Sequence, residues 1–386
     1  MSYATNSSGT CSGKRPQTKT AKQPSKRSPS ANEIAKNKAY FETWCHHQNL
    51  EQTSYKDIPE DLKADIEQVF NVSQKIPLGW VTKKSKQYKL LKKIATPDFL
   101  TFVRQAHKEN EELFYEEEND DEAFGPLFMD ISMVYSCWEA LAKKRKSKEN
   151  WSEADYGANV YTPVRRAGLK ESTKRNQCRV CLPQHLVLEK MGSESRRILG
   201  ARMVIPDCAV FVPEHLVAKL SDSEDSAFKK LKRHESAHNT GEPTRQSSFP
   251  YQCTPCFEFA SSFSEDKKPS HQILEDAYRQ NRMSTASAVR HLHSLHVNAP
   301  VFGLVWSDNH VRAHVDWWKI TNDEQLIVYS APYMEEEARK EKEWELHKPS
   351  DLLEVFLILR NIDRFTTGPF VEKVEKGMHI NLGGSP

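Results

Sequence analysis

Acidic and basic side chains at the end of an apolar segment point to phosphodiester chemistry. The segment ends in Glu265, Asp266 and Lys267, and an earlier apolar run contains Asp207 directly after a proline. Two carboxylates can hold Mg²⁺ through oxygen atoms and leave positions open for water and phosphate. A metal held in this way lowers the pKa of a bound water and stabilises charge on the phosphate. These residue types therefore predict metal-dependent cleavage of phosphodiesters.

Strand periodicity indicates which of the neighbouring charges belong together. Side chains alternate between the two faces of a strand. The odd positions from 257 to 263 are three phenylalanines and a serine, and Glu265 and Lys267 continue that face, whereas Asp266 and Lys268 point the other way. We expect Glu265 and Lys267 to emerge together at the edge of the core. There the lysine could orient or deprotonate the attacking water, or offset charge on the phosphate.

The second acid, Asp207, is the only charge in the run from Met203 to Val212. This run is apolar on both faces, which predicts a buried central strand. A buried lone carboxylate is costly unless it pairs or binds a cation. The expected partner is a metal ion or Lys267.

Helical and strand patterns alternate around these residues, which predicts an α+β fold. Ser152 is a typical N-cap and favours a helix that begins near Trp151 and ends near Pro163. The elements expected after it are strands at 178–182, 201–212 and 257–267, a helix at 270–296, a hairpin with strands 300–306 and 311–318, and a short strand at 326–331.

Composition divides the chain into three parts. Residues 1–35 are rich in Ser, Thr, Lys and Pro, which predicts a disordered basic tail. Residues 36–148 form a mostly helical N-terminal region with an acidic run at 109–122. The remainder, 149–380, is the expected core; it includes a mobile polar insertion at 221–249, a charged exposed helix at 335–347 and a last apolar helix at 351–365.

A Pro-Asp pair at 206–207 followed by Glu265-Asp266-Lys267 resembles the signature of the PD-(D/E)XK nuclease superfamily. The resemblance covers about residues 151–330 and implies the restriction-endonuclease-like fold, a mixed sheet flanked by helices. In that fold a helix, three antiparallel strands, a second helix and a further strand follow one another, with the motif on the second and third strands. The stretches SEADYGANVY, EDKKP and AYRQNRM are similar to a fungal branch of the superfamily.

The resemblance implies further site residues. The first helix of such folds often supplies another acid, which falls on Glu153 or Asp155. The later helix often supplies side chains near phosphate, which fall on Tyr278, Gln280 and Arg282. About 58 residues separate the two halves of the motif, more than is usual, and the polar insertion accounts for that length.

Two hypotheses about function follow from the resemblance. In the first, the protein is a Mg²⁺-dependent endonuclease or exonuclease acting on DNA or RNA. Asp207 and Glu265 would hold the metal, Glu153 would be an additional ligand, and Lys267 would position the water. In the second, the fold is catalytically inactive and serves as a nuclear module that binds nucleic acid or protein, because many copies of a fold keep the scaffold without the chemistry.

Cysteine spacing offers a third and weaker hypothesis, a zinc-stabilised interaction module. Cys178 and Cys181 form one CxxC pair, and Cys253 and Cys256 form another. Each pair could supply half of a Cys₄ zinc site. The gap of about 71 residues between the pairs is far longer than in compact zinc sites, so zinc is not the expected cofactor.

Charge and hydropathy restrict the partners and the compartment. The formal net charge of +2 predicts no partner by itself. Basic residues cluster at 14–27 and at 143–148, a pattern typical of nuclear import, with the cytoplasm as the alternative location. No apolar run approaches the roughly 20 residues of a membrane span, so nucleic acid is the expected partner and a membrane is not.

Overall fold

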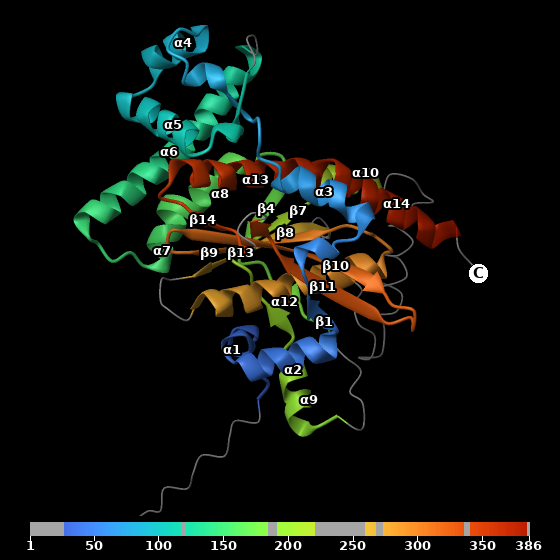
Figure 1. Ribbon diagram of the computed structural model, residues 1–386. Helices are drawn as coiled ribbons and strands as arrows, with labels where there is room; N and C mark the ends of the chain where they lie inside the picture. The colour runs from blue at the N-terminus through green and yellow to red at the C-terminus, as the bar shows by residue number, and fades with distance from the viewer. Residues whose placement is uncertain are drawn as a thin grey trace, which may run out of the picture.

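The computed structural model describes residues 27–116, 121–183, 191–220, 259–267, 273–335 and 340–383. A large mixed sheet lies between two layers of helices, so the predicted α+β class is confirmed (Figure 1). The strands are β1 (Leu50–Gln52), β2 (Ile76–Pro77), β3 (Phe114–Tyr115), β4 (Thr173–Asn176), β5 (Val180–Cys181), β6 (Met203–Val204), β7 (Cys208–Phe211), β8 (Ala260–Lys267), β9 (Val301–Ser307), β10 (His310–Ile320), β11 (Leu326–Pro332), β12 (Met334–Glu335), β13 (Lys340–Glu341) and β14 (Glu343–Glu345).

The main sheet has eight strands, seven of them in the order β1-β11-β10-β9-β8-β7-β4, with β14 paired to β10. Strand β7 is antiparallel to both of its neighbours, β4 and β8, and β8 is parallel to β9. A parallel pair needs a crossover connection, which the helix α12 (Ile273–Ser294) supplies. Strands β9, β10 and β11 then continue as an antiparallel meander, as the hairpin pattern predicted.

Helices cover both faces of this sheet. The helices other than α12 are α1 (Ala31–Lys36), α2 (Lys38–Gln48), α3 (Glu60–Phe70), α4 (Lys86–Ile94), α5 (Pro97–Glu109), α6 (Asp121–Ser147), α7 (Glu153–Tyr156), α8 (Thr162–Gly168), α9 (Ser193–Leu199), α10 (Glu214–Leu220), α13 (Pro349–Thr367) and α14 (Pro369–Gly383). On one face α12 lies on the sheet with α1 and α2 beneath it, and on the other face lie α3, α8 and α13 (Figure 1).

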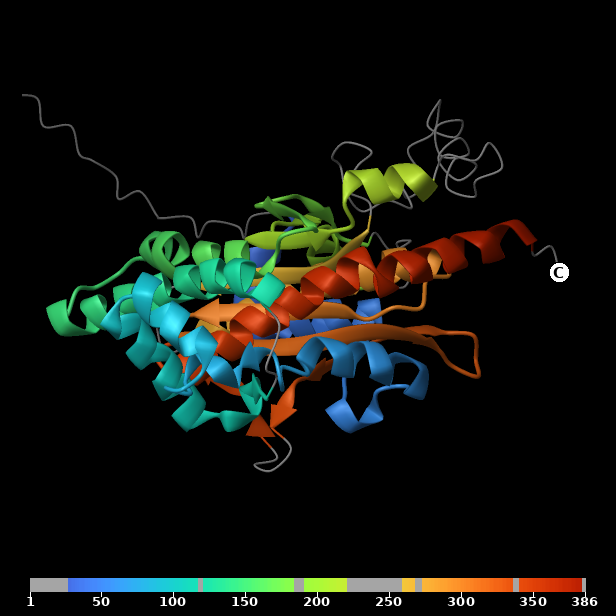
Figure 2. The same cartoon turned by 90° about the horizontal axis from the view of Figure 1, so that it is seen from above.

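The two central helices are buried for different reasons. Residues 280–289 of α12 are all buried, because the sheet covers one side of the helix and α1 covers another. Helix α13 is apolar around most of its circumference and packs on α3, α5, α6 and α8 as well as on the sheet. Seen from above, α14 continues beyond the end of α13 (Figure 2).

The N-terminal region joins the core sooner than expected. Helix α1 begins at Ala31, and Ser30 and Glu33 form its capping box, so the predicted disordered tail of 1–35 is wrong for its last residues. Residues 1–26 lie outside the described residues. Beyond α2, β1 pairs in parallel with β11 and extends the sheet. In the described part of 36–148 helices predominate, with the short strands β1, β2 and β3 as exceptions.

Other expectations are corrected by the structure. The helix that begins after Ser152 does not end near Pro163, because the backbone stays helical through this proline and α8 continues to Gly168. A π-helical turn at Gly157–Tyr161 connects α7 to α8. The described residues of the charged segment 335–347 form short strands, among them β14, in place of the expected helix. The last helix ends at Gly368 as expected, but α14 follows it. The predicted insertion 221–249 lies outside the described residues.

The long helices α6 and α12 are too polar, or too short in apolar length, to cross a bilayer. Within the described ranges, no helix combines the length and hydropathy of a membrane span.

Candidate active site

Asp207 lies directly before β7 and not inside a continuous strand. The predicted strand at 201–212 is divided between β6, which pairs with β5, and β7, which belongs to the main sheet. Strand β7 is antiparallel to β8 with Cys208 opposite Ser264, so the start of β7 lies beside the end of β8. There the Asp207 Oδ2 atom accepts a hydrogen bond of 2.7 Å from the main-chain N–H of Asp266. The structure thus brings the two halves of the sequence motif together.

Glu265 and Lys267 lie on one face of β8, as strand periodicity predicted. The Lys267 Nζ atom donates to Glu265 Oε1 at 2.5 Å, and Glu265 is 1% exposed. This face is the one that α12 covers. Phe263 and Glu265 are in register with Gly303 and Val305 of β9, and a Cβ added at Gly303 would collide with a side chain of α12.

Asp266 points to the opposite face, which α8 covers. Its carboxylate accepts hydrogen bonds from both terminal nitrogens of Arg165, one of them at 2.9 Å. Both side chains are largely buried, and the guanidinium also lies 4.7 Å from the centre of the Trp306 ring. Such a paired, planar contact fixes the main chain between Glu265 and Lys267. The structure therefore separates Asp266 from the candidate site, as expected.

Burial and mutual repulsion make the two candidate ligands reluctant to ionise. Burial, followed by the charge of Asp266, raises the pKa of Asp207 to about 6. Burial raises the pKa of Glu265 well above its ordinary value, with Lys267 opposing the shift and Asp207 adding to it. Burial by itself would lower the pKa of Lys267. The negative charges of Glu265 and Asp207 outweigh this effect and raise the pKa, so Lys267 is a cation at neutral pH.

Glu265 has one oxygen that an additional cation could contact. The second carboxylate oxygen of Glu265, Oε2, is buried and has no hydrogen-bond partner among the described residues. Leaving a buried acceptor unpaired is costly. In the same described ranges, no three His, Cys, Asp or Glu side chains gather as a complete metal site. Asp207 and Glu265 would thus be two ligands, a number typical of Mg²⁺ sites that keep water and substrate phosphate.

The two acids proposed from the first helix behave differently. Asp155 is the capping-box residue of α7, and its carboxylate accepts from the Ser152 N–H and hydroxyl at 2.7 Å each. These hydrogen bonds lower the pKa of Asp155. The charge of Glu153 instead acts on Lys267 and raises its pKa. Glu153 is exposed on α7, so its role as a metal ligand stays a prediction.

The three residues expected near phosphate do not share one face of α12. Tyr278 and Arg282 are one turn apart and line the same pocket, whereas Gln280 is about 200° away around the helix axis. Gln280 is 8% exposed, and its Oε1 atom has no partner among the described residues.

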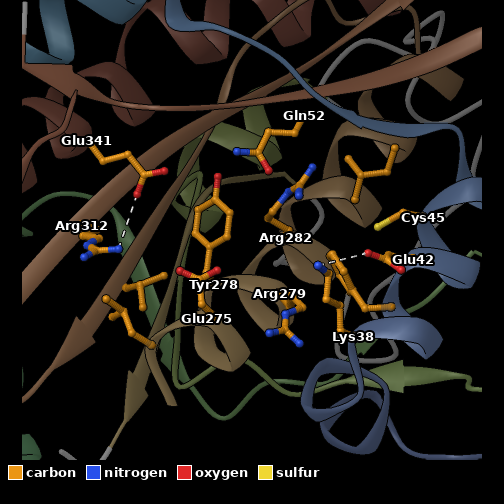
Figure 3. A pocket seen from close by; sticks show the side chains of 14 residues that line it. Lys38, Glu42, Cys45, Gln52, Glu275, Tyr278, Arg279, Arg282, Arg312 and Glu341 are labelled. Carbon is orange, nitrogen blue, oxygen red and sulfur yellow. Dashed lines mark hydrogen bonds and ion pairs between the residues drawn. The ribbon is translucent and has the colours of Figure 1, made fainter. Parts of the chain in front are cut away.

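The pocket beside Tyr278 and Arg282 has a volume of about 450 Å³ and lies between α2, α12 and the sheet (Figure 3). Its floor includes Val305, the residue next to Glu265 in the neighbouring strand. Burial raises the pKa of Cys45, which lines the pocket, to about 12. This thiol is therefore neutral at physiological pH.

The sequence did not predict the ion pairs that two basic residues form inside the protein. Lys144 was counted in a basic import cluster, but its ammonium group lies 3.2 Å from Asp308 and contacts the hydroxyl of Tyr156. It is 18% exposed, so it is largely withdrawn from that cluster. Arg165 was also missed. A basic residue in a helix is usually solvated, and only the partner on β8 marks this one as structural.

The structure describes only one of the two CxxC pairs on which the zinc hypothesis rests. Cys181 lies in β5 and Cys178 precedes it, both partly buried. Cys253 and Cys256 lie outside the described residues. Zinc at these cysteines stays a prediction.

Comparison with known proteins adds no assignment: no family model matches the chain, and no curated protein matches it either. The chemistry of the site must therefore be inferred from its own geometry.

Proposed function

We propose that this chain is a metal-dependent, nuclease-like protein that hydrolyses phosphodiester bonds in nucleic acid, with the restriction-endonuclease-like fold. One observation carries the proposal. Asp207 directly precedes β7, and its carboxylate accepts a hydrogen bond from the main-chain N–H of Asp266 at the end of β8, where Lys267 contacts Glu265. This is the combination of residue types that the PD-(D/E)XK resemblance requires.

The order of elements supports the same fold. The helix from Glu153 to Gly168 precedes β4, and β7 and β8 complete three antiparallel strands. Helix α12 and the parallel strand β9 follow. Asp207 borders the second of the three strands, and Glu265 and Lys267 lie on the third.

The donor set fits a hard divalent cation. Asp207 and Glu265 offer carboxylate oxygens, one of which is buried without a partner, and both pKa values are raised in the metal-free state. Bound there, Mg²⁺ would lower the pKa of a coordinated water and offset charge on the phosphate. Lys267 carries the positive charge that would orient the water and stabilise the anionic transition state.

A cleavage assay with purified full-length protein tests the proposal. Single-stranded and double-stranded DNA and RNA would be incubated with Mg²⁺, with Mn²⁺ or with EDTA. We expect cleavage that requires the metal and falls at least a hundredfold in Asp207→Asn, Glu265→Gln and Lys267→Ala. Cleavage that persists in EDTA, or in all three variants, would contradict the proposal.

Matched controls separate the site from general charge effects. Asp323 and Lys319 are exposed residues on the β10–β11 hairpin. Asp323→Asn and Lys319→Ala change the same charges at a distance, and we expect them to retain wild-type activity. Circular dichroism of each variant would establish that the fold is intact.

The second candidate is a catalytically inactive nuclease fold that binds nucleic acid or protein in the nucleus. The ion pair of Lys267 with Glu265 favours it, because the lysine already compensates one carboxylate without any metal. Absence of cleavage together with salt-dependent binding of nucleic acid would select this candidate.

A further inference from the structure

We propose that the outward side of helix α4 binds the phosphate backbone of a nucleic-acid duplex through Lys86, Lys89 and Lys93. The inference rests on the proposed function and adds to it a second contact surface for the substrate. In Figure 1 α4 lies beyond α5 at the top of the molecule, whereas the sheet that carries the candidate active site lies below α13. The surface is also outside residues 151–330, the part of the chain that the nuclease resemblance covers, so the resemblance does not assign it.

The chain has a dense basic segment at α4. Six lysines lie between residues 83 and 93, and no acid occurs from residue 68 to residue 97. The six are Lys83, Lys84, Lys86, Lys89, Lys92 and Lys93, and all of them are exposed. None of them forms an ion pair with an acid in the described part of the chain. The segment therefore presents positive charge that no neighbouring side chain neutralises.

The helix turns three of these lysines directly away from the core. Leu91 is 0% exposed and marks the buried side of α4. At about 100° per residue, Lys89 and Lys93 lie about 160° around the helix axis from Leu91, and Lys86 lies about 140° from it. The three side chains therefore form one outward row, which is about 10 Å long.

The two exposed apolar side chains of α4 do not belong to this outward row. Leu90 is 45% exposed and Ile94 is 52% exposed. They lie about 100° and about 60° from Leu91, on one flank of the helix. A helix that enters a lipid surface turns its apolar side chains toward the lipid. The outward row of α4 is instead entirely basic, which fits a polyanion and not a lipid surface.

Helix α4 is anchored to the N-terminal region. Ser85 caps the helix by accepting a hydrogen bond of 2.9 Å from the Tyr88 N–H, and its hydroxyl donates to the main-chain oxygen of Gly79. Gln87 is 7% exposed and packs over Gly79, where an added Cβ would collide with it. Through these contacts α4 packs on the helical turn η2 (Leu78–Trp80), and it also packs on α5. The anchoring holds the lysine row in a fixed orientation.

The lysines are unfavourable for the helix itself. Lys89 lies three residues from Lys86 and Lys92 and four from Lys93, spacings at which like charges repel one another. The first turn contains Lys86 and no acid, although the positive end of the helix dipole favours acids there. Bound phosphate groups would offset both effects. Charge that opposes folding in the free protein is expected where it contributes to binding.

The row fits a duplex better than a single strand. A duplex carries one phosphate charge per about 1.7 Å of its axis, so about six charges accompany a row of about 10 Å. Single strands are bound largely through aromatic side chains on which the bases stack. Helix α4 contains one aromatic residue, Tyr88, and it is half-buried. Contacts to phosphate carry no base information, so we expect binding that does not depend on sequence.

Fluorescence anisotropy with a labelled DNA duplex of about 30 base pairs tests the inference. The measurement would be made on the full chain in EDTA, over a series of NaCl concentrations. We expect the α4 triple variant, Lys86→Gln/Lys89→Gln/Lys93→Gln, to bind at least tenfold more weakly than wild type at low salt. The slope of log K against log salt should become shallower by about 2 to 3, because each lost phosphate contact removes about 0.9.

Two control variants separate this surface from general effects of charge. Lys56, Lys319 and Lys376 are exposed lysines on other elements. Their combined replacement by glutamine removes the same number of charges and should weaken binding less than threefold. Leu90→Ser/Ile94→Ser alters the apolar flank of α4 and should bind within twofold of wild type. Circular dichroism of each variant would establish that the fold is intact.

Several outcomes would overturn the inference. Wild-type protein that does not bind the duplex is one, and an α4 triple variant that binds as tightly as the control triple variant is another. A tenfold loss in Leu90→Ser/Ile94→Ser would assign the helix to an apolar partner. Vesicles of phosphatidylcholine and phosphatidylserine that bind the wild type but not the α4 triple variant, without duplex binding, would assign it to a lipid surface. A tenfold preference for single-stranded DNA would overturn the assignment to a duplex.

Failure of this inference and failure of the proposed function are distinguishable. Duplex binding that depends on α4, without metal-dependent cleavage, removes the nuclease and keeps the surface. Metal-dependent cleavage with unchanged binding by the α4 triple variant keeps the nuclease and removes the surface. If both hold, the α4 triple variant should raise KM for the duplex and leave kcat unchanged, because the lysines lie away from the candidate active site.

Discussion

The main chain of Asp266 holds Asp207 while its side chain holds Arg165. The N–H donates to the Asp207 carboxylate at 2.7 Å, and the carboxylate of Asp266 accepts two hydrogen bonds from the guanidinium. One residue therefore connects the start of β7, the end of β8 and helix α8. The position of Glu265 and Lys267 depends on this connection, because they flank Asp266 in the chain.

Breaking the buried pair should destabilise the fold. We expect Asp266→Asn and Arg165→Met each to lower the free energy of unfolding by about 3–5 kcal/mol, because each leaves a buried charge without its partner. Urea denaturation measures this. The double variant Arg165→Met/Asp266→Leu removes both charges and should recover part of the loss. Single variants no less stable than the double variant would show that the pair does not matter.

Asp207→Asn should stabilise the metal-free protein above pH 6. Because the pKa of Asp207 is raised to about 6 in the folded state, the folded chain retains a proton that the unfolded chain has lost. Unfolding then releases protons between about pH 4 and 6, so stability falls as the pH rises through this window. Asparagine removes the penalty, on the order of 2 kcal/mol at neutral pH. Urea melts at pH 4 and pH 7.5 would show whether the gain disappears in acid.

Mg²⁺ should raise the Tm of the wild-type protein. A ligand that binds only the folded state at a hundredfold its Kd stabilises by about 2.7 kcal/mol. We expect this shift to vanish in Asp207→Asn and Glu265→Gln, and to persist in Asp323→Asn. Differential scanning calorimetry with NaCl at matched ionic strength as the reference would measure it. Equal shifts in all four proteins would place the ion elsewhere.

Gly303→Ala should disrupt the contact between β9 and α12. A Cβ at this position would collide with the Nε2 atom of His314 and the Oδ1 atom of Asn281, which hydrogen bond each other at 2.8 Å. We expect a loss of about 3 kcal/mol, at the upper end of typical overpacking costs.

Gly157→Ala is the matched control for this substitution. No atom lies within 4 Å of the added Cβ, and the residue is helical, so alanine should be neutral or stabilising. Urea denaturation of both variants compares them. Equal stabilities of the two variants would show that the side chains between β9 and α12 shift to accommodate the added Cβ at little energetic cost.

The face of the strand on which each side chain lies could be predicted from the sequence, but the contacts between distant segments could not. Alternation alone placed Glu265 and Lys267 on one face and Asp266 on the other, because β8 pairs with β9 without a register shift from Ser262 to Lys267. The position of Asp207 required knowing that β7 pairs with β8 at that point. Arg165 gave no local signal, because its partner lies 101 residues away.

Local sequence patterns could not predict the short strands β1 and β14. The segment 335–347 is so charged that a solvated helix was expected. Within it Glu343 and Glu345 flank the buried Trp344, an alternation of three residues that becomes a strand only because β10 offers a pairing edge. β1 is equally short and depends in the same way on β11.

The pairing of β1 with β11 has a consequence for biosynthesis. Leu50 lies opposite Val328, so about 280 residues must be translated before the N-terminal helices meet their sheet. At 5–20 residues per second, this delay is roughly a quarter of a minute to a minute. Until then Phe41 and Trp44, both buried in the finished protein, belong to a segment that lacks the pairing of β1 with β11. A segment that is translated early is therefore among the last to complete its native contacts.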